Sequence, residues 1–261
     1  KPTNIIKDFI LICYLLGNDF LPHIPSLNIY KNGMDNILDT YTDTIIELDG
    51  AICLQGKMNK ISINYSFLLS FLSKLSINED SNLKNLWTKK RKRYFCKSSE
   101  PYEKEIHYIE NLKFKINDPI QLGSDDLEVS RKKYYKHYFH VDESELETFS
   151  EKIAHHYLIG IEWVAKYYFD KCPSWNWYFP YDHPPFLQDI SKHKINFKDI
   201  KFELGKPLLP YQQLLCVLPK ESSYLLPKCL AHLMSNYYSE LSHLYPSKFD
   251  QDFINKKKYW M

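Results

Sequence analysis

Apolar residues recur along most of the chain at intervals of three and four, the spacing that places side chains on one face of an α-helix. Residues 3–17 are apolar on nearly every side, which predicts a buried helix that ends at Gly17. Further helices are predicted over 34–48, 65–77, 125–140, 142–171, 210–217 and 224–236. Ser144, with Glu147 three residues later, predicts a capping box at the start of the segment 142–171. The pattern indicates a mainly α-helical fold.

Other segments lack this helical spacing. Residues 51–55 and 60–63 predict a short β-hairpin. Residues from about 78 to 125 are charged, mixed in sign and poor in periodicity, so we expect a surface insertion there. The aromatic and proline-rich residues 172–187 and the polar bridge 188–201 are expected to connect helices.

The composition narrows the possible functions. Glycine is scarce, at 7 of 261 residues, whereas the chain holds 21 Tyr, 15 Phe and 5 Trp. Neither a G-x-G-x-x-G nor a P-loop pattern is present, which argues against a glycine-rich nucleotide fold. Because the net charge is only +2, any nucleic-acid surface would have to come from a local asymmetry of charge.

The six cysteines are scattered without a C-x-x-C pair, which favours free thiols in a reducing intracellular compartment. Cys13 and Cys216 lie in apolar runs, so both are expected to be buried. No signal peptide is visible, and no apolar run approaches the roughly 18–20 residues of a membrane span. The chain begins with Lys1 inside a helical pattern, so we expect it to be a piece of a longer protein.

Asp19 follows the first predicted helix directly, in the sequence Gly17-Asn18-Asp19. A carboxylate at the C-terminal end of a helix is unfavourable by roughly 0.3–1 kcal/mol, so a cation is one natural partner. The other interpretation is a turn, because Asn and Asp tolerate unusual backbone angles. Asp8 would share a face with Asp19 if the helix ran unbroken, and is otherwise expected to be a solvated residue near the helix start.

The cations of 88–97 and 131–140 alternate with aromatic residues, a mixture that can hold a phosphate backbone and stack bases. Acidic residues flank both runs, so a solvated surface is favoured for each. Tyr134, Tyr135 and Tyr138 of the second run are expected to pack inward.

The segment "SWNWYFPY" holds large aromatic side chains at alternate positions, namely Trp175, Trp177, Phe179 and Tyr181. In an extended backbone these four would turn to one side. Packing into the core and stacking on an unpaired base both remain open for them.

The segment "DFILICYLLGNDFLPHIPSL" (8–27) closely resembles the part of Xrn-type 5′→3′ exoribonucleases that carries their last catalytic aspartate. That family belongs to the wider flap-endonuclease-like group of metal-dependent nucleases. Three later segments resemble the same family in the same order: "LIGIEWVAKYYF" (158–169), "CPSWNWYFPY" (172–181) and "FELGKPLLPYQQLLCVLPKESSYLLP" (202–227). The charged stretch around 80–125 fits the resemblance least.

The resemblance implies a catalytic and metal-binding role for Asp19. It implies two divalent ions, Mg²⁺ or Mn²⁺, which together activate a water and stabilise the leaving oxygen. A tryptophan of the aromatic block would stack on the first bases of the RNA, and either Trp175 or Trp177 could be that residue. The candidate residues that could orient this metal ligand without binding the metal themselves are Asp8, Asn18, His23 and Lys206.

The resemblance also implies a division of the chain. Residues 1–30 would form the edge of an α/β nuclease core and carry the metal ligand, and residues 31–261 a helical domain packed on that core. The other acidic ligands and the basic pocket for the 5′ phosphate would lie in a nuclease segment before Lys1. The 261 residues alone are therefore expected to be inactive.

The function implied is degradation of 5′-monophosphorylated single-stranded RNA to mononucleotides, in the cytoplasm or, as an open alternative, in the nucleus, without a membrane partner. Ile159 stands where the family more often has an acidic residue, and Asp182 and His183 depart from its usual pattern. Two alternatives stay open: a flap-type structure-specific DNA nuclease, and a non-catalytic RNA-binding relative.

Overall fold

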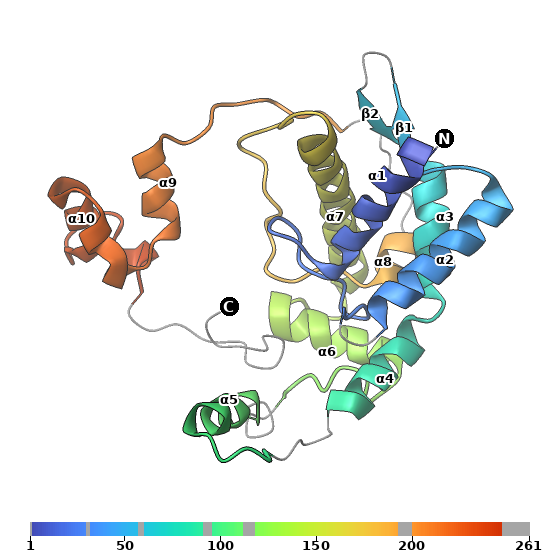
Figure 1. Cartoon of the computed structure of the whole chain (residues 1–261), viewed down its shortest axis with the longest axis horizontal. Coiled ribbons are helices and arrows are strands. Elements are labelled where there is room, and N and C mark those ends of the chain that lie inside the picture. Colours follow the sequence, from blue (N-terminus) through green and yellow to red (C-terminus); the bar gives the residue numbers. More distant parts are fainter. Residues whose placement is uncertain are drawn as a thin grey trace. The chain divides into compact units, whose positions relative to one another are not determined.

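The computed structural model describes residues 2–29, 32–56, 60–90, 96–111, 118–192 and 200–246. The chain forms two compact units (Figure 1). The first unit comprises Lys1–Arg93 and Asn117–Leu204, and the second comprises Tyr94–Ile116 and Gly205–Met261.

The first unit contains seven α-helices among its described residues, together with one 3₁₀ turn and one β-hairpin. They are α1 (Pro2–Cys13), η1 (Tyr14–Leu16), α2 (Gly33–Leu48), β1 (Cys53–Gln55), β2 (Ile61–Ile63), α3 (Tyr65–Ser76), α4 (Glu79–Lys90), α6 (Leu127–Phe139), α7 (Leu146–Phe169) and α8 (Leu187–Lys192). The second unit contains α5 (Pro101–Asn111), α9 (Pro210–Val217), η5 (Lys220–Leu225), α10 (Lys228–Ser235) and η6 (Ser242–Leu244). In it, α10 packs against η5 and η6.

The expectation of a mainly helical fold with a short hairpin is confirmed. The helices predicted over 34–48, 65–77 and 210–217 are α2, α3 and α9. The predicted hairpin is the antiparallel pair β1 and β2, in which Cys53 lies opposite Ile63. The described helices do not include one long and apolar enough to cross a membrane.

The charged stretch 78–125 is more regular than the sequence predicted, because α4 and α5 both lie within it. The polar bridge 188–201 likewise overlaps α8. Most of the side chains of α4 are charged or polar, and among those that the structure describes only Glu79 and Leu83 are buried. The apolar spacing is therefore too sparse to reveal a helix.

The predicted capping box of α7 is wrong. The helix starts at Leu146, and the side chain of Glu145, its N-cap residue, makes no capping hydrogen bond. The carboxylate of Glu147 instead pairs with Lys192 and with Arg131, at 3.1 Å from the guanidinium. Ion pairs to other elements have displaced the local cap.

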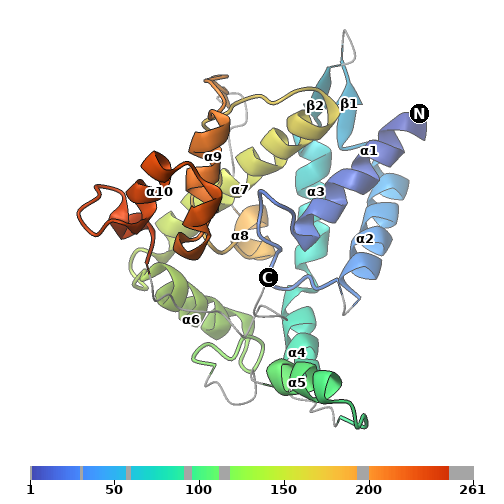
Figure 2. The same ribbon diagram turned by 60° about the vertical axis from the view of Figure 1, so that its left-hand side comes forward.

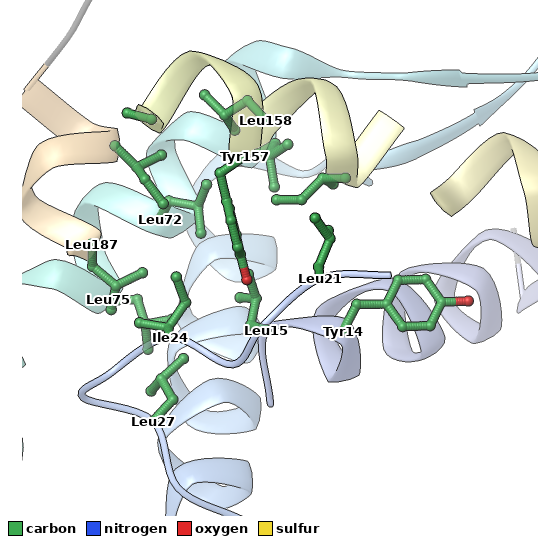
Figure 3. Packing of buried hydrophobic residues seen from close by; sticks show 14 of the residues in the cluster. Tyr14, Leu15, Leu21, Ile24, Leu27, Leu72, Leu75, Tyr157, Leu158 and Leu187 are labelled. Atoms are coloured by element: carbon green, nitrogen blue, oxygen red, sulfur yellow. The ribbon is translucent and has the colours of Figure 1, made fainter. Parts of the chain in front are cut away.

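The core of the first unit lies between α7 and the elements around it. Figures 1 and 2 show α7 beside α1, α8 and β2, which it contacts. In Figure 3, Tyr157 reaches from α7 toward the loop that carries Leu21 and Ile24. Leu75 and Leu187 lie next to Ile24, on the other side of Tyr157 from Leu21. All five side chains are buried, so α7 fixes the position of that loop.

The expectation that the first helix is buried all round is wrong. Leu11 and Ile12 are buried, but four other large apolar side chains of α1 are exposed: Ile5 (51%), Ile6 (61%), Phe9 (44%) and Ile10 (37%). These four residues, called here the α1 apolar face, recur at one and four residues and so share one side of the helix. The helix is therefore apolar on two sides, of which this fold buries one.

All six cysteines are free, as expected. Cys216 is exposed, contrary to expectation, because α9 has no buried residue; Cys13 is half-buried rather than buried.

In the run 131–140, Tyr134 and Tyr135 are buried and Tyr138 is half-buried, so the inward packing is confirmed. Lys132 pairs with Glu143 at 2.9 Å and Lys133 with Asp125 at 2.6 Å, as on a solvated surface. Arg131 departs from that expectation, because it is buried and pairs with Asp189 at 2.7 Å. The run 88–97 includes residues 91–95, which lie outside the described residues.

Candidate functional site

The loop after η1 forms a tight turn around Asp19. Gly17 ends the helical segment with φ +95°, a left-handed conformation that favours glycine. The Asn18 Oδ1 accepts hydrogen bonds from the backbone N–H groups of Phe20 (2.8 Å) and Leu21 (3.0 Å). The N–H of Asn18 donates in turn to the Leu21 carbonyl at 3.0 Å. The turn interpretation is therefore confirmed, and it leaves the Asp19 side chain pointing out of a rigid loop.

The carboxylate of Asp19 is exposed and, among the described residues, makes neither a hydrogen bond nor an ion pair. Its oxygens are hard donors of the kind that Mg²⁺ and Mn²⁺ prefer. The described residues contain no group of three or more His, Cys, Asp or Glu side chains that could hold a metal ion. Asp19 can thus supply one ligand, and a complete metal centre needs others from elsewhere.

Asp8 does not share a face with Asp19, because α1 ends at Cys13 and η1 follows. Its carboxylate is fully buried, so the expectation of a solvated residue is wrong. It accepts hydrogen bonds from the Tyr41 hydroxyl (2.6 Å), the Ile52 N–H (2.7 Å) and the Cys53 N–H (2.6 Å). These contacts join α1 to α2 and β1, which gives Asp8 a structural place in the fold.

Phe20, the residue after Asp19, is part of a group of packed rings that we call the aromatic wall: Phe20, Trp163, Tyr167 and Trp177. Trp163 lies in the middle, stacked on Tyr167 (centroids 5.1 Å apart, 9° between planes) and on Trp177 (5.5 Å, 26°). The ring of Phe20 meets Trp163 at 4.9 Å and Tyr167 at 5.0 Å. Tyr167 is 38% exposed, so the wall reaches the surface next to Asp19.

The two tryptophans of the aromatic segment differ in exposure. Trp177 is half-buried within the wall, whereas Trp175 is 50% exposed and its backbone N–H donates to the Leu204 carbonyl at 2.8 Å. Phe179 is buried and Tyr181 half-buried, so core packing is confirmed for Trp177, Phe179 and Tyr181. The predicted common side does not extend to Trp175.

Helix α7 holds the loop and the wall together. The buried Tyr157 donates from its hydroxyl to the Pro22 carbonyl at 3.0 Å, three residues beyond Asp19. Six residues further along, Trp163 donates from its indole N–H to the Ser174 carbonyl at 3.0 Å. Sequence reasoning missed Trp163 and Tyr167 as members of the site, although their i, i+4 spacing could have indicated a stacked pair.

The other candidates lie in different surroundings. The buried Nδ2 of Asn18 has no hydrogen-bond partner among the described residues. His23 is half-buried, and a Cβ at Gly17 would come within 3.2 Å of its Cβ, so it packs against the turn. Lys206 is exposed in the second unit, and the structure does not relate its position to Asp19.

The two residues that depart from the family pattern lie outside the aromatic wall. Asp182 is exposed, and the ring of His183 stacks on Tyr138 at 3.6 Å. Ile159 is half-buried on α7.

A buried carboxylate joins the far end of the loop to the start of α8. Glu79 at the start of α4 accepts from the Ser26 hydroxyl (3.1 Å) and from the backbone N–H groups of Leu187 and Gln188 (2.8 Å each). Burial raises the pKa of Glu79 to about 7, against the effect of these hydrogen bonds.

The sequence of this chain is similar to known proteins of one family. The family model described as the Xrn1 helical domain matches residues 1–111 and 96–261. The chain is 32% identical over 286 residues to human 5′-3′ exoribonuclease 1, a match that covers 98% of this chain and 17% of that protein. It is 27% identical over 365 residues to 5′-3′ exoribonuclease 2 of Candida albicans, covering 98% of this chain and 38% of that protein.

A shorter match, at 42% identity over 128 residues, links 49% of the chain to 13% of 5′-3′ exoribonuclease 2 of Kluyveromyces lactis. The chain thus spans well under half the length of these relatives. Taken with the helical fold, these matches show that the chain belongs to the Xrn-type 5′→3′ exoribonuclease family, in the part described as its helical domain.

Proposed function

We propose that this chain is the part of a 5′→3′ exoribonuclease that supplies one metal-ligating aspartate and an aromatic surface for single-stranded RNA. The substrate would be RNA with a 5′ monophosphate, released as mononucleotides, and the location cytoplasmic or nuclear. The observation that carries the proposal is the exposed carboxylate of Asp19, without a partner among the described residues, one residue from the aromatic wall.

Asp19 fits a site for Mg²⁺ or Mn²⁺ as one ligand among several. When bound, a pair of such ions supplies an activated water and stabilisation of the leaving oxygen. Asp19 would anchor this pair from a loop held rigid by Asn18 and by Tyr157. The other acidic ligands would come from residues outside this chain.

The aromatic side chains would bind the RNA as an unpaired strand. Stacking of a base on an aromatic ring contributes about 1–3 kcal/mol and tolerates any base, which suits an enzyme that degrades RNA of any sequence. Trp175 offers a half-exposed ring for such a contact, and Trp177 is held in place by Trp163. Bases within a duplex are already stacked and paired, so this surface favours single strands.

The α1 apolar face supports the division of the chain at about residue 30. Four large exposed apolar side chains on one side of a helix are a typical docking surface. We infer that they pack on the α/β nuclease core, which would bring the other acidic residues toward Asp19. On this basis the 261-residue chain alone should release no nucleotides.

The test compares the complete protein with Asp19→Asn and, as a matched control, Asp43→Asn, which alters an exposed aspartate on α2. Mononucleotide release from 5′-monophosphorylated RNA in Mg²⁺ should fall by roughly two orders of magnitude or more for Asp19→Asn, since even indirect supports of a metal cost 10–100-fold. The control should retain normal activity.

Preferential cleavage of branched DNA by the wild type would favour the flap-type nuclease instead. Binding of RNA without any nucleotide release would favour the non-catalytic relative. Activity of Asp19→Asn equal to that of the control would remove the metal-ligand role.

A further inference from the structure

One face of α7 carries three residues spaced by three that contact both halves of the site. Tyr157 binds the Pro22 carbonyl of the Asp19 loop, and Trp163 stacks on Trp177 of the aromatic segment. Gly160 lies between them, on the same side of the helix, and is buried. The loop and the tryptophan therefore approach the helix at this glycine.

A side chain at Gly160 would fit only if its neighbours moved. A Cβ there would lie 2.5 Å from Leu21 Cδ2, closer than carbon atoms pack, and 3.0 Å from Trp177 Cη2, which is a tight contact. The backbone does not require glycine, because residue 160 lies within α7 and has no positive φ. Alanine would be the better helix former at this position. Space, rather than backbone conformation or helix propensity, is the physical reason that glycine suits this position.

A displacement of Leu21 would move Asp19. The N–H of Leu21 donates to the Asn18 side chain and its carbonyl accepts from the Asn18 N–H, so residues 18–21 move as one closed turn. Trp177, on the other side of the missing Cβ, belongs to the aromatic wall. Gly160 is thus the point at which the metal-ligand loop and the tryptophan are held at a set separation.

We propose that Gly160 is a positioning residue that sets the distance between the Asp19 carboxylate and the Trp177 ring. That distance decides whether a base stacked on the wall leaves its phosphodiester at the metal-binding carboxylate. This inference rests on the proposed function, and it adds a residue that touches neither metal nor RNA. A mutation far from the reacting atoms that misplaces a catalytic group by about 1 Å can lower the rate about 100-fold.

The experiment uses the complete protein with Gly160→Ala, Leu21→Val and the double variant. Leu21→Val shortens the side chain that the new methyl would strike, so the double variant nearly conserves the volume. Glu151→Ala, at an exposed position of α7, is the control for altering the helix. Three quantities are measured for each variant: kcat and KM on 5′-monophosphorylated RNA, the thermal midpoint, and the Kd for single-stranded RNA in EDTA.

Gly160→Ala should lower kcat/KM at least tenfold at a temperature well below its own thermal midpoint, where the variant is still folded. The double variant should recover most of kcat, because the loop returns to its place. Any remaining loss of kcat/KM should appear as weaker binding of single-stranded RNA in EDTA. Without a metal ion, this Kd reports the contact of the RNA with the aromatic wall.

Two results would overturn the inference. One is a kcat/KM for Gly160→Ala within twofold of the Glu151→Ala control. The other is a loss of activity that follows the thermal midpoint in all three variants, which is what a purely structural role gives. An inactive wild type would instead refute the proposed function, and this inference with it.

Discussion

Replacing Glu79 by glutamine should remove one large contribution to the dependence of stability on pH between pH 5 and 8. The Glu79 carboxylate is fully buried and accepts three hydrogen bonds, from Ser26, Leu187 and Gln188. Burial is the largest effect on its pKa and raises it from 4.5 to about 7, and the nearby Asp189 adds to the increase. The charge of Asp189 is itself balanced by Arg131 at 2.7 Å.

The sign follows from proton linkage. Because the pKa of Glu79 is higher in the folded state than in the unfolded state, the folded protein holds this proton more tightly. The stabilisation is complete below the unfolded pKa near 4.5 and is lost as the pH rises through about 7. With these two pKa values, the contribution of Glu79 to the free energy of unfolding falls by about 2–3 kcal/mol between pH 5 and pH 8.

The assay is urea denaturation followed by tryptophan fluorescence at several pH values, for wild type, Glu79→Gln and the control Glu151→Gln. Glutamine does not titrate, so the stability difference between wild type and Glu79→Gln should shift by about 2–3 kcal/mol over this range. The control alters an exposed glutamate and should keep the wild-type pH profile. A constant difference, within about 0.5 kcal/mol, between wild type and Glu79→Gln would refute the reasoning.

Two further substitutions test other parts of the structure. Asp8→Asn places an amide NH₂ among three donors, so we expect a loss of about 2–4 kcal/mol in urea denaturation, while Asp43→Asn on an exposed face should cost less than 0.5 kcal/mol. Trp175→Ala should weaken binding of single-stranded RNA to the complete protein by about 1–3 kcal/mol, with little change in thermal midpoint because the ring is 50% exposed. Equal weakening by Tyr178→Ala, whose ring is 72% exposed, would show that exposure alone explains the effect.

Local patterns were sufficient where one face of an element is buried and the other is wet. The predicted segments 34–48 and 65–77 agree with α2 and α3 to within a residue, because their buried side chains recur at the helical period. Local patterns failed where the buried and exposed faces of an element differ little in polarity. In α4 polar residues fill most positions, and in α1 apolar residues cover two sides of which only one is buried. The predicted cap at Ser144 failed because Glu147 had stronger partners in Arg131 and Lys192.

The candidate site divides in the same way. The turn that presents Asp19 follows from four consecutive residues, since Asn18 closes it with hydrogen bonds to its neighbours. The sequence by itself therefore determined the helical class, the turn and the identity of the exposed acid. Only the tertiary structure decided that Asp8 is buried and that Trp163 stacks on Trp177, because those contacts join residues far apart along the chain. Periodicity tells which side of an element is apolar, but the partner that covers it is chosen by packing.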